Sequence, residues 1–302
     1  MIAIETKNLT KIYNGKKVVN EVSLQVKKGE IFGFLGKNGA GKSTFINIIT
    51  GLCHANYGSY KLDCKDIKKS VGVMPDYSSL YSELTGKEHI KYFSNLLNKK
   101  MSKNDISNLL NLVGLDNGLD LKIKKYSFGM KKKLAIAQSL INDPEILFLD
   151  EPTSGVDANS ILTIHNLIKK ISEKGTTIFI TSHNLNEIEK LCNEIAIMDK
   201  GKINIQGNID EIKQKHRQDL TLNLEHESIN QSVLNDLRDK LYNFSLLLLK
   251  VEHNNTQSYI QLKSKNDINK ILELFLEFNI NLLRVQIKEP SLEEIFVSTG
   301  NE

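Results

Sequence analysis

The eight residues from Gly36 to Ser43 constrain the fold of this chain more than any other segment. They read Gly-Lys-Asn-Gly-Ala-Gly-Lys-Ser and match G-x-x-x-x-G-K-[ST], the loop that wraps the phosphates of a nucleoside triphosphate. A short apolar run, 31–35, precedes the loop, and a helical pattern, 44–50, follows it. Because the chemistry needs this order of strand, loop and helix, we predict an α/β nucleotide-binding domain.

The types of residue in the loop explain how it would hold phosphates. Glycines let backbone N–H groups turn toward the phosphates, and the positive end of the following helix adds to the attraction. We expect Lys42 to reach the β- and γ-phosphates and to act in catalysis, and Ser43 to ligate Mg²⁺. The alternative, a glycine-rich turn that carries Lys-Ser by chance, is disfavoured by the flanking strand and helix. The predicted phosphate-binding residues are Gly36, Asn38, Gly39, Ala40, Gly41, Lys42, Ser43 and Thr44.

A second motif places two acids at the end of a buried strand. Residues 146–149 are apolar, and Asp150 and Glu151 follow them directly. Ligands bind at this carboxyl edge in open α/β sheets. We expect Asp150 to hold Mg²⁺ through water and Glu151 to polarise the water that attacks the γ-phosphate. If these acids merely ended a strand at the surface, the phosphate loop would lack its usual metal partner.

Composition fits a globular chain of about two domains. The 302 residues are 40% hydrophobic and 25% charged, which is close to ordinary usage. The net charge of +4 falls short of what a dedicated nucleic-acid binder carries. Three cysteines without a C-x-x-C pair indicate neither a disulfide framework nor a zinc site, and they fit a reducing compartment. With no apolar run of about 18 residues and no basic, apolar leader, we expect neither a membrane span nor a signal peptide.

The pattern of elements predicts a nucleotide-binding domain, 1–216, and a smaller domain, 217–302. In the first domain, further buried strands are expected at 177–181 and 194–198, and a polar stretch, about 84–128, predicts a helical insertion. The second domain reads strand, helix, strand, strand, helix, strand, which is the order of a small ferredoxin-like α+β domain. Its expected elements are 219–224, 230–240, 244–251, 258–262, 266–278 and 282–287.

The remaining motifs of the first domain resemble those of the ATP-binding subunits of ABC transporters. Tyr-Ser-Phe-Gly-Met at 126–130 stands at the family's signature position, and a helical pattern follows it at 131–141. Ser-Gly-Val-Asp at 154–157 corresponds to the family's D-loop, and His183 to its switch histidine. The order and spacing of the motifs match this family and no other phosphate-loop class known to us. The resemblance covers residues 1 to about 215.

The resemblance implies an ATPase, built on a mixed sheet, that closes as a head-to-tail dimer around two ATP molecules. Ser127 and Gly129 then bind the γ-phosphate of the ATP held by the opposite subunit, and Asp157 contributes from the D-loop. His183 orients the γ-phosphate and the attacking water, and Tyr13 stacks on adenine. Taken singly, a histidine after a strand such as His183 is structural about half the time, and a tyrosine such as Tyr13 is more often a packing residue; the order of the motifs favours these roles.

The sequence departs from the family pattern at several positions. Phe128 and Met130 replace the second small residue and the glutamine of the usual signature, and Lys37 stands where proline is usual. Asp76 stands where the family commonly has a glutamine that senses Mg²⁺ and links to the membrane partner. We expect Asp76 to approach the metal through water. The alternative is that Asp76 merely starts a loop after Pro75.

Two segments, 80–88 and 289–296, resemble the stand-alone ATPase subunits of bacterial ABC-2-type exporters. This branch implies a separate permease of about six transmembrane helices that exports drugs, antibiotics, antimicrobial peptides or toxin peptides. It also implies a homodimer or a pseudo-dimer with a second ATP-binding subunit, a place on the cytoplasmic face of the bacterial membrane, and no nucleic-acid partner. We expect the permease to dock on 80–98, although a solvated helical bundle is an alternative for this segment.

Two rival functions are weighed against this one. A soluble ABC ATPase that acts on ribosomes or nucleic acid usually carries two fused nucleotide domains or a coiled-coil insertion, and the sequence has neither. A non-hydrolysing regulator would be expected to lack the acid or the histidine, whereas Glu151 and His183 are both present. For the small domain, a dimer-stabilising or regulatory role and inert packing stay equally open.

Overall fold

The computed structural model describes residues 1–215, 221–244, 246–252, 255–262, 264, 266–288, 292 and 295. Its contacts divide the chain into two compact units, Met1–Asn208 and Ile209–Glu302. The division falls eight residues before the predicted boundary at 216/217, because the short helix α8 (Ile209–Lys215) groups with the second unit. Residues 219 and 220 of a predicted strand lie outside the described residues, as does the segment 289–296 apart from 292 and 295.

The central sheet of the first unit has six strands in the order β5-β6-β7-β3-β8-β9. All neighbours pair in parallel except β9, which runs antiparallel to β8. The four strands predicted here form within one residue of their expected ends, and the predicted mixed sheet is confirmed. Parallel strands end at one edge, so β3, β6 and β7 deliver their following loops to the same place. The strands are β3 (Ile31–Leu35), β5 (Val71–Val73), β6 (Ile146–Asp150), β7 (Thr177–Ser182), β8 (Glu194–Asp199) and β9 (Lys202–Asn208).

A second, antiparallel sheet of the first unit has the order β2-β1-β4. Its strands are β1 (Ile2–Tyr13), β2 (Lys16–Lys27) and β4 (Tyr57–Leu62). Asn14 and Gly15 join β1 to β2 with φ values of 49° and 76°. Positive φ at both central residues suits the two-residue turn whose twist matches a hairpin, and Asn-Gly is its favoured sequence.

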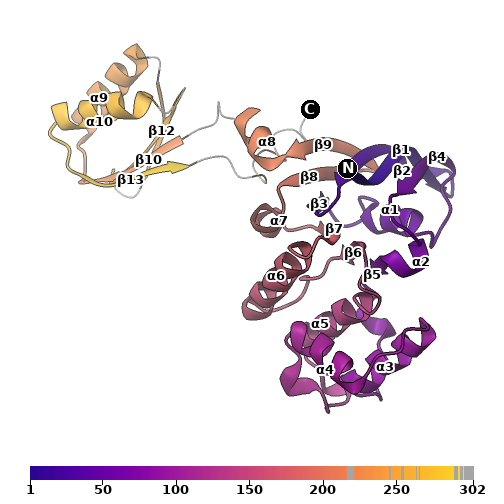
Figure 1. The fold of residues 1–302 in the computed structure, drawn as a ribbon. Helices are drawn as coiled ribbons and strands as arrows, with labels where there is room; N and C mark the ends of the chain where they lie inside the picture. Colours follow the sequence, from indigo (N-terminus) through magenta and orange to yellow (C-terminus); the bar gives the residue numbers. More distant parts are fainter. Residues whose placement is uncertain are drawn as a thin grey trace. The chain divides into compact units, whose positions relative to one another are not determined.

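Seven helices of the described part of the first unit surround these sheets. The predicted insertion at 84–128 contains α3 and α4, and each begins with a capping box, Thr85 with Glu88 and Ser102 with Asp105. In Figure 1, α3, α4 and α5 lie together at the end of the unit away from β1, β2 and β4. The helices are α1 (Lys42–Ile49), α2 (Ile67–Ser70), α3 (Gly86–Leu96), α4 (Lys103–Leu112), α5 (Phe128–Ser139), α6 (Ala158–Ser172) and α7 (Leu185–Leu191).

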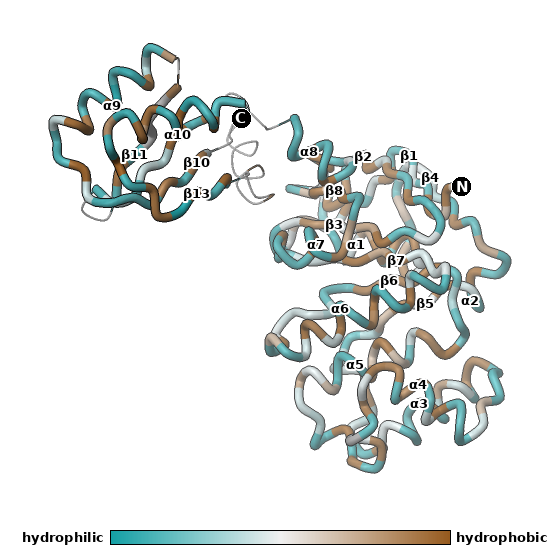
Figure 2. Tube along the Cα trace, turned by 60° about the vertical axis from the view of Figure 1, so that its left-hand side comes forward, coloured by the Kyte–Doolittle hydropathy of each residue, from teal (hydrophilic) through white to brown (hydrophobic). Residues whose placement is uncertain are grey.

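Five phenylalanines form the centre of the core between α1 and the main sheet. Each is at most 1% exposed, and their ring centroids lie 4.9 to 6.0 Å apart in the contacting pairs. Burying such a side chain stabilises the fold by roughly 1.5–3 kcal/mol, so this cluster fixes α1, and with it the phosphate loop, on the sheet. In Figure 2, hydrophobic residues lie along β6 and β7. The five are Phe32, Phe34, Phe45, Phe148 and Phe179.

After α8, the described part of the second unit has one antiparallel sheet in the order β11-β12-β10-β13, together with the helices α9 and α10. Its elements follow one another as strand, helix, strand, strand, helix, strand, and the predicted ferredoxin-like order is confirmed. Leu222 and Leu224 alternate inward along β10 and share a core with Leu237 and Phe275 of the helices. The elements are β10 (Thr221–His226), α9 (Gln231–Asn243), β11 (Leu247–Glu252), β12 (Gln257–Gln261), α10 (Asp267–Glu277) and β13 (Leu282–Lys288).

Among the helices that the structure describes, none combines the length and the apolar character needed to cross a bilayer.

Candidate functional site

The phosphate loop leaves β3 and leads into α1 at the carboxyl edge of the main sheet. Its glycines at 36 and 41 have φ values of 155° and 110°, which L side chains rarely adopt. A Cβ at Gly36 would lie 2.3 Å from the carbonyl oxygen of Met198, and one at Gly41 would lie 2.4 Å from that of Val18. Only glycine therefore fits both positions, and the backbone forms a cradle too tight for side chains.

A pocket of about 210 Å³ opens on this cradle. It is lined by the loop, by the start of α1, and by single residues from β2 and from the end of β6. Seven of the eight predicted phosphate-binding residues are among them. The exception is Gly36, whose carbonyl accepts a hydrogen bond from Lys42. The lining residues are Val18, Asn38, Gly39, Ala40, Gly41, Lys42, Ser43, Thr44 and Glu151.

Lys42 is held inside the site, with 6% of its surface exposed. Its Nζ donates to the carbonyl oxygens of Gly36, at 2.6 Å, and Lys37, at 3.4 Å. The same Nζ lies 3.4 Å from Glu151 Oε1 in an ion pair. Burial of an ammonium is costly without such partners, so the loop carbonyls and the carboxylate keep the charge in place for an anionic ligand.

Glu151 follows β6 and takes a left-handed backbone, with φ 49°. Its N–H donates to Thr181 Oγ1 at 3.0 Å, and its carbonyl accepts from Lys132 Nζ at 2.7 Å. The carboxylate is shared between neighbours, with Oε2 2.8 Å from Nδ1 of His183. Oε1 is buried and accepts no hydrogen bond, because its contact with Lys42 has the geometry of an ion pair alone. Leaving a buried acceptor without a hydrogen-bond donor costs free energy. An oxygen in this position is suited to accept a proton from a bound molecule.

Asp150 and His183 complete the acidic side of the site. Asp150 Oδ1 accepts a hydrogen bond from Thr181 Oγ1, so one hydroxyl orients both consecutive acids. His183 follows β7 and is 48% exposed, which leaves the far side of its ring open to a ligand. The structure thus brings Lys42, Asp150, Glu151 and His183 to one edge of the sheet.

These residues fit Mg²⁺ and a nucleoside triphosphate. Hydroxyl and carboxylate oxygens such as those of Ser43 and Asp150 are the hard ligands that Mg²⁺ prefers, and Mg²⁺ usually combines one or two of them with substrate phosphates. Among the described residues, no group of three or more His, Cys, Asp or Glu could hold a metal ion. The orphaned Glu151 Oε1 and the glycine cradle are the structural observations on which the fit depends.

A second group of predicted residues lies at the starts of α5 and α6. Ser127 caps α5, its Oγ accepting from the Met130 N–H at 3.2 Å, and Asp157 caps α6 by accepting from the Ser160 N–H at 3.0 Å. That hydrogen bond lowers the pKa of the Asp157 carboxyl. Gly129 packs against α6, since a Cβ there would lie 2.9 Å from Ser160 Oγ. None of Ser127, Gly129 and Asp157 is among the described residues that line the phosphate pocket.

The structure also places Tyr13 and Asp76. Tyr13 ends β1 and is 46% exposed, with Lys11 Nζ 5.0 Å from its ring centroid. Asp76 precedes a short 3-10 turn, Tyr77–Ser79, and its Oδ1 accepts from the Ser78 N–H at 2.7 Å. The hydrogen bonds from Ser78, aided by the charge of Lys132, lower the pKa of the Asp76 carboxyl. Asp76 is not among the described residues of the phosphate pocket, so its metal role stays a prediction.

Sequence reasoning missed Val18, Thr181 and Lys132. Val18 comes from the antiparallel sheet, and its carbonyl closes one side of the cradle. Thr181 and Lys132 bond Glu151 from 30 and 19 residues away along the chain. No local motif marks such contacts, although Thr181 directly precedes Ser182 and the predicted switch histidine His183.

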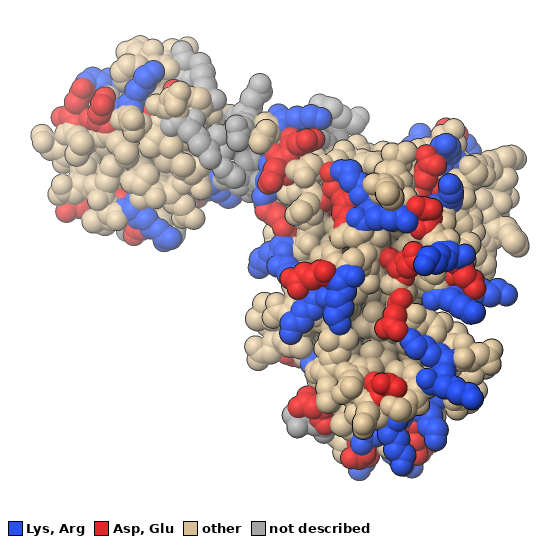
Figure 3. Space-filling model, viewed as in Figure 1, with Lys and Arg blue, Asp and Glu red and all other residues tan. Residues whose placement is uncertain are grey.

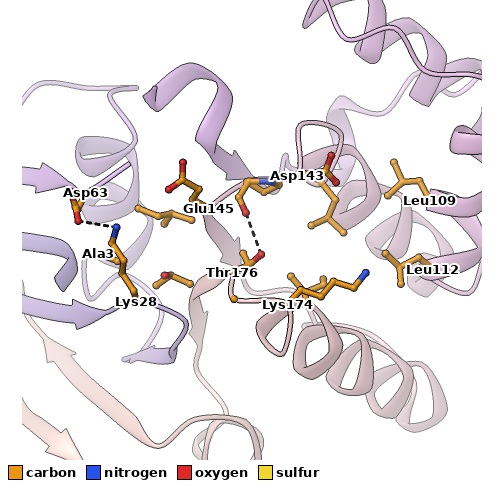
Figure 4. Close-up of a pocket in the computed structure, with 15 residues that line it drawn as sticks. Ala3, Lys28, Asp63, Leu109, Leu112, Asp143, Glu145, Lys174 and Thr176 are labelled. Carbon is orange, nitrogen blue, oxygen red and sulfur yellow. Dashed lines mark hydrogen bonds and ion pairs between the residues drawn. The ribbon is translucent and has the colours of Figure 1, made fainter. Parts of the chain in front are cut away.

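A larger pocket, of about 350 Å³, lies at the opposite edge of the sheet (Figure 4). It is lined by the amino ends of β6 and β7 and by leucines of α4. Its charges are largely neutralised by neighbours, as in the pairs Lys28 with Asp63, at 2.9 Å, and Lys99 with Asp143, at 2.5 Å. Since the chemistry of the motifs lies at the carboxyl edge, size alone does not make this pocket the functional one.

Comparison with known proteins agrees with this geometry. The family model described as ABC transporter matches residues 19–154, and the model described as ATP-binding protein DrrA1-3-like, C-terminal domain, matches 207–299. The bacitracin transport ATP-binding protein BcrA of Bacillus licheniformis is 33% identical over 97% of this chain and 96% of its own length. The linearmycin resistance ATP-binding protein LnrL of Bacillus subtilis is 32% identical over 98% and 97%.

Solved structures of the same kind match about 70% of this chain. A nucleotide-free ATP-binding cassette from an ABC transporter superposes with a TM-score of 0.64 at 25% identity, covering 71% of this chain and 94% of that one. The dimeric post-hydrolysis structure of the ATP-binding cassette MJ0796, bound to ADP and Pi, gives a TM-score of 0.62 at 25% identity, covering 68% and 98%.

Proposed function

Because the chain belongs to the family of ABC transporter ATP-binding subunits, we propose that it hydrolyses ATP to drive a separate membrane permease that exports drugs or antimicrobial peptides. One observation carries the catalytic part. The buried Oε1 of Glu151, which forms an ion pair with Lys42 but accepts no hydrogen bond, lies at the same pocket as the glycine cradle. A carboxylate oxygen that accepts no hydrogen bond, placed beside a phosphate cradle, is available as the general base that hydrolysis needs and simple nucleotide binding does not.

Each residue of the pocket then has a task. The amides of Asn38–Thr44 hold the phosphates, and Lys42 exchanges its loop carbonyls for phosphate oxygens. Ser43, and Asp150 through water, would hold Mg²⁺, which would neutralise phosphate charge. Glu151 takes the proton of the attacking water at Oε1, while His183 fixes Oε2 and presents its other nitrogen toward the γ-phosphate. Tyr13 stacks on the base.

The second group of residues supports a dimer. Ser127 caps a twelve-residue helix whose first amides make an anion site, yet this site lies apart from the phosphate pocket of its own chain. In our proposal, Ser127 and Gly129 bind the γ-phosphate of ATP held by a second subunit, and Asp157 contributes beside them. Both this arrangement and the dimeric form of the similar cassette MJ0796 bound to ADP and Pi favour two ATP molecules between two subunits.

The membrane partner is proposed to dock on residues 80–98, beside the loop that starts at Asp76. Large side chains stay exposed there, among them Tyr81, Tyr92 and Leu96. A permease of about six transmembrane helices, with this subunit on the cytoplasmic face of the membrane, follows from the exporter branch. Export is favoured by the relatives, which are named for bacitracin transport and linearmycin resistance. Lysines and acids are interspersed on the face of the first unit in Figure 3, which does not favour ribosomes or nucleic acid as partners.

The test is a capture experiment from membranes of the native cell solubilised in detergent. Tagged Glu151→Gln protein, with ATP and Mg²⁺, should retain a membrane protein of about six helices in stoichiometric amount, identified by mass. Lys42→Ala protein, which should not bind nucleotide, is the matched control and should retain less of it. Deleting the captured permease should then sensitise cells to an antimicrobial peptide. Recovery of ribosomal proteins or nucleic acid, with no membrane partner, would overturn the proposal.

A further inference from the structure

Lys132 of α5 is a buried lysine with no role in the proposed nucleotide contacts. Its side chain is 6% exposed, and its Nζ donates to the carbonyl oxygen of Glu151 at 2.7 Å. Moving an ammonium out of water costs several kcal/mol unless partners compensate for it. A lysine at the surface would avoid this cost. The burial of Lys132 therefore indicates that its hydrogen bond to Glu151 has a function.

That bond acts on the backbone of the predicted general base. Glu151 has φ 49°, and a left-handed conformation costs a non-glycine residue about 1–2 kcal/mol. Its peptide groups are held on both sides, the N–H by Thr181 Oγ1 at 3.0 Å and the carbonyl by Lys132. With the backbone so held, the carboxylate reaches Lys42 and His183 at 3.4 and 2.8 Å.

Two aromatic rings cover the buried amine. Lys132 Nζ lies 5.7 Å from the ring centroid of Tyr77 and 5.8 Å from that of Phe128, and the two rings contact each other edge to face at 4.6 Å. Tyr77 belongs to the loop that starts at Asp76, and Phe128 stands where the family signature has a small residue. A Cβ on Gly155 would lie 3.0 Å from the Phe128 ring, so the D-loop packs on the same cluster.

We propose that Lys132 is a positioning residue for ATP hydrolysis. Its hydrogen bond holds Glu151 in the left-handed conformation, and its contact with Tyr77 makes this hydrogen bond depend on the position of the 76–79 loop. The inference rests on the proposed function, because it concerns the base of that reaction. A shift of Tyr77 changes the packing over Lys132 Nζ, and Lys132 passes the change to the carbonyl of Glu151. Lys132 itself lines no part of the described phosphate pocket, so it acts on turnover and not on ATP binding.

The experiment compares three variants of the full-length protein with wild type. Lys132→Met removes the donor at nearly constant volume, and Lys132→Arg restores a cationic donor. Lys133→Met is the matched control, since it removes the neighbouring charge from the same helix without touching Glu151. For each, kcat for ATP hydrolysis, the Kd of a fluorescent ATP analogue with Mg²⁺, and the melting temperature are measured.

We expect Lys132→Met to lower kcat at least tenfold with a Kd within twofold of wild type, Lys132→Arg to recover most of the loss, and Lys133→Met to match wild type. A kcat within twofold of wild type for Lys132→Met would overturn the inference. So would a parallel loss of kcat, affinity and melting temperature, because that pattern marks a structural lysine. If wild type shows no hydrolysis even with its permease, the proposed function fails; if only the Lys132 result fails, the proposed function stands.

Tyr77→Ala tests the link to the loop, and it keeps the inference falsifiable if Lys132→Met does not fold. Removing the ring should lower kcat about threefold in the wild-type background and leave Kd unchanged. Combined with Lys132→Met, it should cause little further loss, because contacts in one network are not additive. An unchanged kcat for Tyr77→Ala, or full additivity in the double variant, would show that Tyr77 does not act through Lys132.

Discussion

A methyl group added at Gly41 should weaken ATP binding far more than the same group added at Gly39. At Gly41 φ is 110°, and a Cβ would lie 2.4 Å from the carbonyl oxygen of Val18 and 2.9 Å from Cε of Met198. At Gly39 φ is 82°, and a Cβ would meet nothing within 4 Å. The two substitutions therefore share backbone strain and differ in steric overlap.

The magnitudes follow from these two terms. A left-handed conformation costs an L residue about 1–2 kcal/mol. If the free loop relaxes to avoid this cost and must return to the cradle conformation when ATP binds, Gly39→Ala should weaken ATP binding by about 5- to 30-fold. Gly41→Ala adds an overpacking cost of about 1–3 kcal/mol, because the Val18 carbonyl belongs to β2 and has little freedom to retreat. The total of about 2–5 kcal/mol corresponds to a loss of about 30-fold to several thousand-fold.

The assay is a titration of each variant with a fluorescent ATP analogue in the presence of Mg²⁺. Thermal melting run in parallel establishes that both variants are folded, so that a change in Kd reports on the loop. We expect Gly41→Ala to bind at least about fivefold more weakly than Gly39→Ala, because the overpacking cost of about 1–3 kcal/mol separates the two variants. Equal losses in the two variants, or a Gly41→Ala protein that binds like wild type, would refute the steric reasoning.

Protonation, thiol burial and the loop at Asp76 each give a further prediction. Burial lowers the pKa of His165 below its ordinary value of 6.5, so the unfolded chain binds the proton more tightly and the free energy of unfolding falls as the pH drops below about 6.5. His165→Asn should flatten this slope in urea unfolding between pH 7 and 5, and an unchanged slope would contradict the assignment. Burial raises the pKa of the Cys192 thiol. Iodoacetamide at pH 8 should therefore alkylate Cys53 and Cys64 in the native protein but leave Cys192 unmodified, as measured by mass spectrometry. An adduct on Cys192 of the native protein would be inconsistent with its burial. Asp76→Asn should preserve the loop, since asparagine also caps turns. It should raise the Mg²⁺ concentration for half-maximal ATPase activity several-fold. An unchanged Mg²⁺ dependence would show that Asp76 only stabilises the loop and does not approach the metal.

The sequence predicted those parts of the site that short motifs encode. The phosphate loop and the acids after β6 are contiguous runs beside buried strands, so spacing alone placed Lys42, Ser43 and Glu151 at one sheet edge. The roles of Ser127 and Asp157 needed the family resemblance. Each caps a helix of its own chain, and nothing local distinguishes such a cap from one that also binds a phosphate of a second subunit.

What the sequence did not predict depends on long-range packing. The strand β4 was not predicted because five of its six residues are exposed, so it lacks an apolar run. Lys132 reads as one of three consecutive lysines, 131–133, and only the folded chain shows that the middle one is buried against Glu151. The division after Asn208 precedes the predicted boundary because α8 (Ile209–Lys215) groups with the second unit, a grouping that depends on contacts in the folded chain.

The most direct test of the proposed dimer is light scattering on Glu151→Gln protein with ATP and Mg²⁺. Without the base, bound ATP should persist, and the mass should rise to twice the 34.2 kDa of one chain. A second substitution, Ser127→Arg, should return the mass to that of one chain, because it blocks the site for the opposite subunit's phosphate. If Glu151→Gln binds ATP and keeps the mass of a single chain, the head-to-tail dimer around two ATP molecules is contradicted.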